Sequence, residues 1–265
     1  MTCRLTVAFF LSDTEPTNSS FMPLLDAPLE ILYDDGPCLV VNKQAGLLTQ
    51  APAGIDSLEV RVKAFYRQRE GKPDDAKTYL GLPHRLDRPV SGAIVFARHV
   101  RAARRLSSQF ENRTVGKNYW ALVAGTVEPD EGAWRDHLHK RHGMAQAEVV
   151  TAEHPAAKHA VLHYRTLWQG VDEAGDPATL LEIELETGRT HQIRVQAASR
   201  GHAVRGDSQY GSTQPFGDLQ LDLRDRPIAL HARQLSFNHP MTGAAVQIVA
   251  PLPPTWAELQ IPIIE

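Results

Sequence analysis

The sequence predicts an α+β fold, with a single domain on a mixed, mostly antiparallel β-sheet with flanking helices and loops. Segments with strand patterns outnumber helical ones, and several strand pairs surround short turns, as in antiparallel hairpins. The chain has 265 residues, 42% of them hydrophobic, which is enough to bury a sizeable core. We find no internal repeat or clear linker, so one folded unit is expected.

Residues 1–28 mix polar residues with prolines, and we expect a loose N-terminal arm there. Their apolar run LTVAFFL has no small-residue cleavage site after it, so we interpret it as a strand or loose start. Order is expected to begin at residue 29. The segments ILY (31–33) and CLVVN (38–42) are predicted strands joined by the turn DDGP.

Two helices and a buried strand are predicted next. Asp56 is a candidate N-cap for the first helix. The apolar face of that helix consists of Leu58, Val62 and Phe65. The run GAIVFAR (92–98) is almost continuously apolar, which is typical of a central strand. Residues 100–110 are expected to be helical, because their apolar residues fall roughly on one side.

The second half of the chain is rich in predicted strands. KNYWALVAG (117–125), AKHAVLHYRTLW (157–168) and ATLLEIELE (178–186) have strand patterns. The last of these alternates apolar residues with glutamates, so one face is expected to be buried and the other wet. RQLSFNHPMTGAAVQIVAP (233–251) is a predicted hairpin around the turn HPMTG.

The segment TGRTHQIRVQAASRG (187–201) changes to a helical period. Thr190 is a candidate N-cap, and Gly201 is a candidate stop signal for this helix. Residues 253–265 are expected to form a C-terminal tail, which leaves residues 29–252 as the folded domain.

Composition argues against several classes of protein. The net charge of −3 gives no overall attraction to nucleic acid, and clusters such as RHVRAARR are most simply solvated helix faces. Cys3 and Cys38 form no C-x-x-C pair, so we expect no disulfide framework and a reducing compartment, the cytoplasm. No stretch approaches the roughly 18 apolar residues of a membrane helix, so no membrane partner is expected.

The segment HRLDRPVSG (84–92) places one acid, Asp87, between Arg85 and Arg88, directly before the predicted central strand. Nearby guanidinium groups stabilise an ionised carboxylate. Such an aspartate is a poor general acid but a ready nucleophile or weak base. From these residues alone, an ion pair that only tethers a loop is the simpler interpretation.

Two further patterns are candidates for ligand binding. Arg189 and Arg194 lie near the start of a predicted helix, where they favour an anion site, although a charged surface helix explains them equally well. Tyr119 and Trp120 point to opposite faces of a strand, so one of them can pack in the core while the other faces a groove and stacks on a base.

No metal or cofactor is expected. His137, His139 and His142 lie close together in HLHKRH, but a metal site usually has firmer ligand spacing and a supporting acid or thiolate. The sequence contains no Walker loop, dinucleotide-binding glycine turn or G-x-S-x-G elbow. These absences argue against ATP, NAD and serine-hydrolase chemistry.

Six segments taken together resemble the ordered signature segments of RluA-type RNA pseudouridine synthases. They are VVNKQAGLLTQ, HRLDRPVSGAIVFAR, KNYWALVAG, ETGRTHQIRVQ, GDSQYG and HARQLSFNHPMTG. The resemblance runs from about residue 29 to residue 252 and implies a pseudouridine synthase catalytic domain. Such enzymes flip a uridine out of RNA, break the bond between ribose and uracil N1, rotate the base and rejoin it through C5.

The resemblance also implies roles for individual residues. Asp87 matches the catalytic aspartate, which acts as nucleophile or as base, and Tyr119 matches the tyrosine that stacks on the uracil. Arg194 matches the arginine that pairs with the aspartate, and Arg85 matches the arginine that fills the space left by the flipped base. The residues expected to bind substrate or RNA are Arg85, His84, Arg88, Lys43, Lys117, Arg189 and His191.

The resemblance implies an enzyme that needs no nucleotide or other cofactor and modifies a stem-loop of rRNA or tRNA, and we expect a monomer. Residues 1–28 are too few for the small N-terminal RNA-binding domain of many members, so substrate choice is expected to rest on the catalytic domain. This chain has Val90 where the family usually has threonine.

Two alternatives remain at this point. One is a non-catalytic RNA-binding protein on the same fold, which the set of Asp87, Tyr119 and Arg194 argues against. The other is a carboxylate-dependent hydrolase, which would need a second acid beside Asp87. Asp74 and Asp75 lie in a polar loop, and the sequence offers no other nearby acid.

Overall fold

The computed structural model describes residues 28–172, 175–259 and 261, so the expected arm lies almost wholly outside the described residues. The strands are β1 Glu30–Asp35, β2 Cys38–Lys43, β3 Ser91–Ala97, β4 Gly116–Ala124, β5 Glu131–Lys140, β6 Ala147–Val150, β7 Lys158–Val171, β8 Pro177–Leu185, β9 Leu230–Asn238 and β10 Ala245–Val249. The helices are α1 Leu58–Arg69, α2 Val100–Glu111 and α3 Gln192–Ala198, with 3₁₀ turns η1 Ser208–Tyr210 and η2 Pro254–Leu259.

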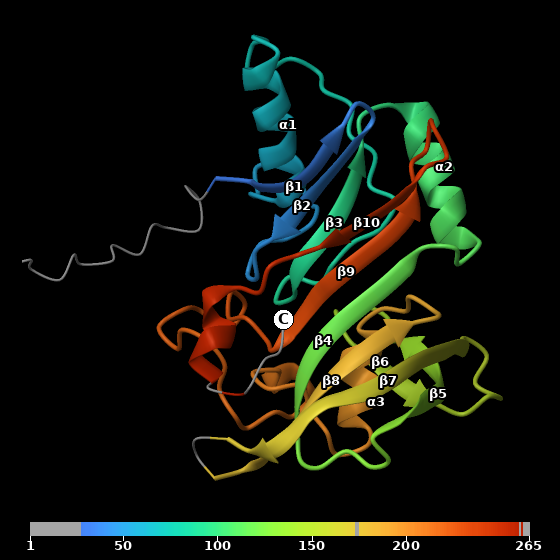
Figure 1. The fold of residues 1–265 in the computed structure, drawn as a ribbon, viewed down its shortest axis with the longest axis vertical. Helices are drawn as coiled ribbons and strands as arrows, with labels where there is room; N and C mark the ends of the chain where they lie inside the picture. Colours follow the sequence, from blue (N-terminus) through green and yellow to red (C-terminus); the bar gives the residue numbers. More distant parts are fainter. Residues whose placement is uncertain (1–27, 173–174, 260, 262–265) are drawn as a thin grey trace, which may run out of the picture.

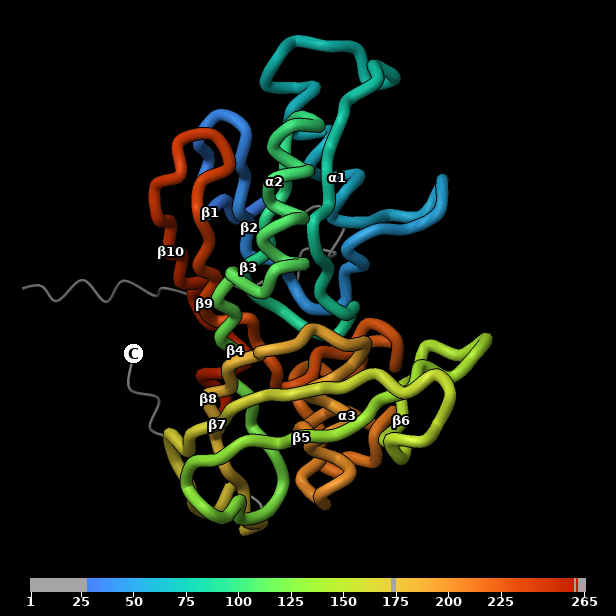
Figure 2. Tube along the Cα trace, turned by 90° about the vertical axis from the view of Figure 1, so that its right-hand side faces the viewer, coloured from blue at the N-terminus to red at the C-terminus, as the bar shows by residue number. Residues whose placement is uncertain are grey.

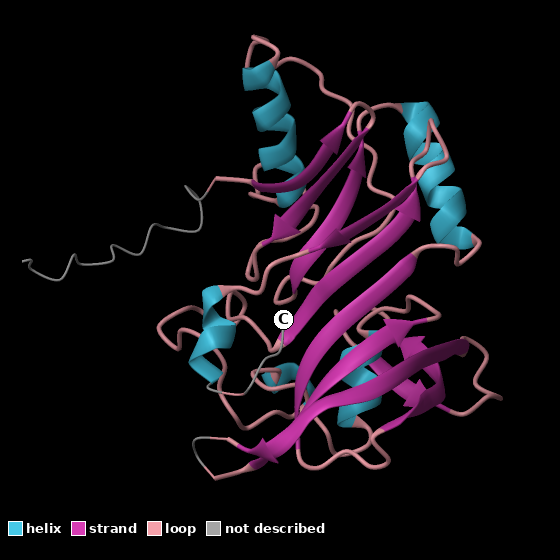
Figure 3. Cartoon of the chain, in the orientation of Figure 1, coloured by secondary structure: helices cyan, strands magenta, loops and turns pink. Residues whose placement is uncertain are grey.

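These strands form one sheet in the order β1-β2-β3-β9-β4-β8-β7-β5-β6, with β10 paired to β9 (Figures 1 and 3). Among the strands of the described residues, only β3 and β9 pair in parallel, and they do so at two positions, Ser91 with His231 and Gly92 with Ala232. The predicted α+β class and mostly antiparallel sheet are therefore confirmed. Because this junction is so short, the sheet consists of two halves that meet beside the HRLDRPVSG segment.

Helices α1 and α2 cover opposite faces of β2 and β3 (Figure 1). Leu58 and Val62 of α1 pack with Ile94 and Phe96, whereas Leu106 of α2 packs on the other face. All seven residues of β3 are buried, as its continuous apolar run predicts. The central strand that follows Asp87 is thus fixed from both sides.

Both predicted helix caps are wrong by one residue. Ser57 caps α1, and its hydroxyl accepts a hydrogen bond from the Val60 N–H, while Asp56 instead pairs with Arg61 at 2.6 Å. His191 stands at the N-cap of α3 in a left-handed conformation, with φ of 51°. The Asp56 carboxylate is bound by Arg61 of the same helix, which leaves the capping position to Ser57.

The end of the chain also differs from the expected tail. Residues 254–259 form η2, and Trp256 is fully buried in the main core with Phe216 and Leu259. The described part of 253–265 therefore belongs to the packed fold. Strands β5 and β6 were not predicted either, because β5 shows no regular alternation of buried and exposed residues. None of the described helices is long and apolar enough to cross a membrane.

Gly92 explains why glycine follows serine in HRLDRPVSG. Its φ is +117°, and a Cβ there would lie 2.4 Å from the carbonyl oxygen of Ala232, so only glycine permits the β3–β9 contact. We expect Gly92→Ala to lower the free energy of unfolding by about 2–4 kcal/mol, measured by urea denaturation. Gly201→Ala is the control: φ is +83° but the space is open, so a loss of about 1 kcal/mol is expected. Equal losses would contradict a steric role for Gly92.

His231 makes the fold sensitive to acid. It is fully buried, its Nδ1 lies 2.8 Å from the Ser91 hydroxyl, and burial lowers its pKa to about 4. In the unfolded chain the His231 ring takes up a proton near pH 6.5, whereas in the folded protein it does so only near pH 4. The free energy of unfolding is therefore highest above pH 6.5 and falls by about 3 kcal/mol as the pH drops to 4. Urea denaturation of the wild type and His231→Gln across this range measures the effect. The same pH dependence in both proteins would rule out His231 as its source.

Candidate active site

The loop that carries Asp87 is fixed by hydrogen bonds from the segment 43–49. Lys43 Nζ donates hydrogen bonds to the carbonyl oxygens of Gln44, Leu47 and Arg88, at 2.7–3.1 Å. The Thr49 hydroxyl donates to the Leu86 carbonyl at 2.8 Å and accepts from the Leu86 N–H at 3.2 Å. The backbone on both sides of Asp87 is therefore fixed, and the segment NKQAGLLT has a clear structural task.

Lys43 itself is not placed to bind RNA, contrary to expectation. It is completely buried, and burial lowers its pKa to about 7. In the charged form, its three carbonyl partners use all three N–H donors. Lys43 therefore positions the loop of Asp87 and is not exposed to a substrate.

Asp87 lies beside a cation from a distant part of the sequence. Arg194 Nη1 donates to Asp87 Oδ2 at 3.3 Å, as expected from the resemblance. The rest of this guanidinium forms a fork with Asp207, at 2.6 and 2.8 Å, and Nη2 also donates to Gln209. The side chains of Arg194 and Asp207 are 4% and 1% exposed, whereas that of Asp87 is 25% exposed. Asp87 is thus the carboxylate of this set that remains open to a substrate.

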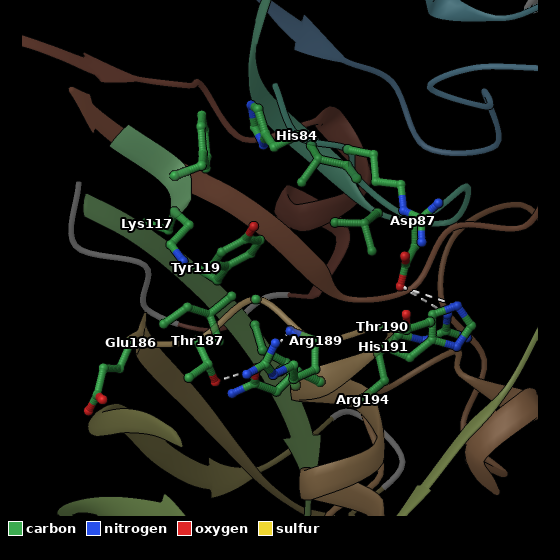
Figure 4. A pocket seen from close by; sticks show the side chains of 18 of the residues that line it. His84, Asp87, Lys117, Tyr119, Glu186, Thr187, Arg189, Thr190, His191 and Arg194 are labelled. Atoms are coloured by element: carbon green, nitrogen blue, oxygen red, sulfur yellow. Dashed lines mark hydrogen bonds and ion pairs between the residues drawn. The ribbon is translucent and has the colours of Figure 1, made fainter. Parts of the chain in front are cut away.

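His191 also faces Asp87, with its Nε2 3.6 Å from Oδ2 (Figure 4). Its Nδ1 lies 2.8 Å from the hydroxyl of Tyr210, which itself accepts a hydrogen bond from the Ala147 N–H. Burial lowers the pKa of His191, so the ring is neutral at pH 7. When the proton of the neutral ring is on Nε2, beside Asp87, the Tyr210 hydroxyl donates to Nδ1.

Two cavities meet at Asp87. The first, of about 440 Å³, is lined among others by Lys117, Tyr119 and Glu186. The second, of about 1040 Å³, is lined among others by Gln50, Lys140, Gln209, Leu223 and Arg224. Residues 83–87, Thr190, His191 and Arg194 line both of them.

Tyr119 and Trp120 divide as the strand pattern predicts. Trp120 is buried in the core, while Tyr119 lines the first cavity, where it projects from β4 opposite Asp87 (Figure 4). Burial, and then the charge of Asp87, raise the pKa of Tyr119. The phenol therefore keeps its proton at neutral pH and offers a ring face and a hydroxyl, not a phenolate base.

The two arginines beside Asp87 have different positions. Arg85 is exposed and lines both cavities. Arg88 turns away from Asp87, donates to the Gly46 carbonyl and pairs with Asp225, so it braces the loop at the wall of the second cavity. The simple interpretation of one acid held by both neighbouring arginines is therefore wrong.

The other expected contacts lie in the first cavity. His84 stacks on Phe110 and accepts from the Val95 N–H, and burial lowers its pKa to about 3, so it is neutral at physiological pH. Lys117 lines the cavity beside Tyr119. Arg189 also lines the first cavity and donates a hydrogen bond to the carbonyl of His159. The start of α3 is not the free anion site that the sequence favoured, because Arg194 is already bound by two carboxylates.

Val90, the departure from the family pattern, is a packing residue. It is 3% exposed, belongs to the main core and also lines the first cavity. Its N–H donates to the Asp87 carbonyl at 3.1 Å, which closes the turn through Pro89. The Val90 side chain packs in the core beside the first cavity, and its backbone supplies the contact to Asp87.

Asp207 and Tyr210 are the site residues that sequence reasoning missed. Both lie in GDSQYG, a segment that contributes to the resemblance but suggests no role by itself. Asp207 is also a second acid near Asp87, which the sequence did not indicate, but both of its oxygens are bound by Arg194. Within the described residues, no group of three or more His, Cys, Asp or Glu side chains could hold a metal ion.

Comparisons with known proteins show which family the chain resembles. The family model described as RNA pseudouridylate synthase matches residues 37–199. The uncharacterized RNA pseudouridine synthase YhcT of Bacillus subtilis is 33% identical, over 92% of this chain and 75% of its own length. The ribosomal large subunit pseudouridine synthase D of Vibrio cholerae is 34% identical, over 91% of this chain and 72% of its own length.

Among solved structures, the human RNA pseudouridylate synthase domain containing 1 matches with a TM-score of 0.64 and 26% identity, covering 85% of this chain and 84% of that one. The sequence and structure matches thus extend over most of the chain, and the family model includes the loop of Asp87. The chain belongs to the RluA-type RNA pseudouridine synthases, a family of isomerases.

Proposed function

We propose that the protein converts specific uridines to pseudouridine in a structured RNA, rRNA or tRNA, with Asp87 as the essential carboxylate and without a cofactor. The observation that carries the proposal is the position of Asp87, a partly exposed carboxylate between two cavities and beside Arg194 and His191. The reaction is an isomerisation with no net redox change, so these side chains suffice for its chemistry.

In this proposal the target uridine leaves its stack and enters the first cavity, where its ring lies on Tyr119. Asp87 attacks C1′ or removes a proton from the ribose, and the bond from C1′ to N1 breaks. The uracil turns and C5 bonds to C1′, while Asp87 either leaves C1′ or returns the proton to the ribose. The C5 proton then leaves and N1 gains a proton. Arg194 and His191 hold the carboxylate toward the sugar, and Arg85 occupies the space that the base has left.

The catalytic domain is proposed to extend from residue 29 through η2, because Trp256 packs in the core. We also propose that the enzyme acts as a monomer in the cytoplasm. The free thiol of Cys38 is buried, and burial raises its pKa to about 12, so its role is packing and not reactivity.

Pseudouridine mapping across the total RNA of a strain that lacks the gene tests this proposal. We expect one or a few uridines to lose the modification and to regain it when the gene is restored. If every site stays modified and the purified protein binds stem-loops without converting them, the chain is a non-catalytic RNA-binding protein on this fold.

A further inference from the structure

The second cavity is larger than the first. Its volume of about 1040 Å³ is more than twice the 440 Å³ of the first cavity, and both open at Asp87. Two loops, 48–56 (blue) and the β5–β6 turn (yellow-green), project on the same side of the molecule in Figure 2, and Gln50 and Ala145 from them line this cavity. If the target uridine occupies the first cavity, the nucleotides next to it in the RNA strand would therefore face the second cavity.

The charge of the second cavity suits a polyanion. Arg85, Lys140 and Arg224 line it, and within the described part of the chain none of the three makes an ion pair or side-chain hydrogen bond. The carboxylates that line it, Asp87 and Asp207, both pair with Arg194. Unpaired cations on a concave surface attract phosphate groups.

One wall of the cavity presents an apolar side chain. Leu223 is 70% exposed, on the loop between η1 and β9. This loop is braced from within: Arg226 donates to the carbonyl oxygens of Leu219 and Leu221, and Asp225 pairs with Arg88. A single exposed leucine is ordinary, but a braced loop that presents one at the rim of a basic cavity suits contact with the face of a base.

We propose that the second cavity binds the RNA strand next to the target uridine, with Leu223 packed on an unstacked neighbouring base and Arg224 and Lys140 at its phosphates. This subsite rests on the proposed function, because it assumes that the target uridine occupies the first cavity. If this subsite exists, the enzyme selects its substrate partly by which nucleotides neighbour the target uridine and by whether those nucleotides are unpaired.

The test uses two variants, Leu223→Ala and Arg224→Ala, each with a matched control. Leu219→Ala changes another exposed leucine of the same loop, and Arg101→Ala changes an exposed arginine of α2; neither residue lines the two cavities. Binding is measured by fluorescence anisotropy with a fluorescein-labelled oligouridylate of about twelve nucleotides. Activity is measured as tritium release from [5-³H]uridine-labelled total RNA of a strain that lacks the gene.

We expect each test variant to weaken oligouridylate binding about three- to tenfold and to raise KM for tritium release by a similar factor, with kcat within about twofold. Arg224→Ala should also reduce the slope of log Kd against log salt by about 0.7, whereas Leu223→Ala should not. Both controls should match the wild type.

Two outcomes separate this subsite from the proposed function. If Leu223→Ala and Arg224→Ala bind the oligouridylate and release tritium like the wild type, the subsite is wrong and the isomerase assignment stands. If the wild type releases no tritium from any RNA but its binding depends on both residues, the subsite stands and the proposed reaction fails.

Discussion

Asp87→Asn abolishes pseudouridine formation if the carboxylate is essential. The amide has the same shape but is a very weak nucleophile and base, so we expect kcat for tritium release to fall at least roughly a thousandfold. RNA binding should be unchanged or slightly tighter, because a negative charge is lost. The fold should tolerate the change within about 1 kcal/mol, since Asp87 is partly exposed and Arg194 keeps its fork with Asp207.

Asp56→Asn is the matched control. Asp56 is also a partly exposed aspartate paired with an arginine, Arg61, but it lines neither cavity. It should leave kcat unchanged while costing as little stability as Asp87→Asn. Conversion of uridine by the Asp87 variant at a rate near that of the wild type would show that another group performs the chemistry.

Elements whose pattern is complete within a short segment could be predicted from the sequence. The strand at 92–98 and the hairpin at 233–251 both appear, because a buried run and a turn between alternating strands are local signals. The division of Tyr119 and Trp120 between cavity and core follows from the same two-residue period. The two cap predictions were each one residue early: Asp56 is bound by Arg61 of its own helix, and His191 takes the N-cap of α3 in a left-handed conformation.

The site could be predicted only in part, for a related reason. The pairing of Asp87 with Arg194 joins residues 107 positions apart, and only the family resemblance indicated it. Nothing in the local sequence distinguishes a buried lysine from a surface one, so Lys43 was expected to bind RNA although carbonyl groups surround it. Asp207 likewise acquires its role only when the chain brings it onto the guanidinium of Arg194.

Arg194→Ala should damage both stability and catalysis, because one guanidinium serves two carboxylates. Asp207 is 1% exposed, and without its partner it becomes an uncompensated buried charge, which costs about 3–5 kcal/mol of the free energy of unfolding. Asp87 loses its charge partner at the same time, so we expect kcat to fall about a hundredfold or more. The single variant cannot separate the two effects, since a partly unfolded enzyme is also slow.

The double variant Arg194→Met, Asp207→Leu separates them. Replacing a buried ion pair by apolar side chains of similar size is often neutral or stabilising, so most of the stability lost in Arg194→Ala should return. Catalysis should not return, because Asp87 still lacks the cation beside Oδ2. Urea denaturation and tritium release on the same protein samples give both quantities. Recovery of kcat along with stability would mean that Arg194 serves only to hold Asp207 in the fold, and that Asp87 works without a charge partner.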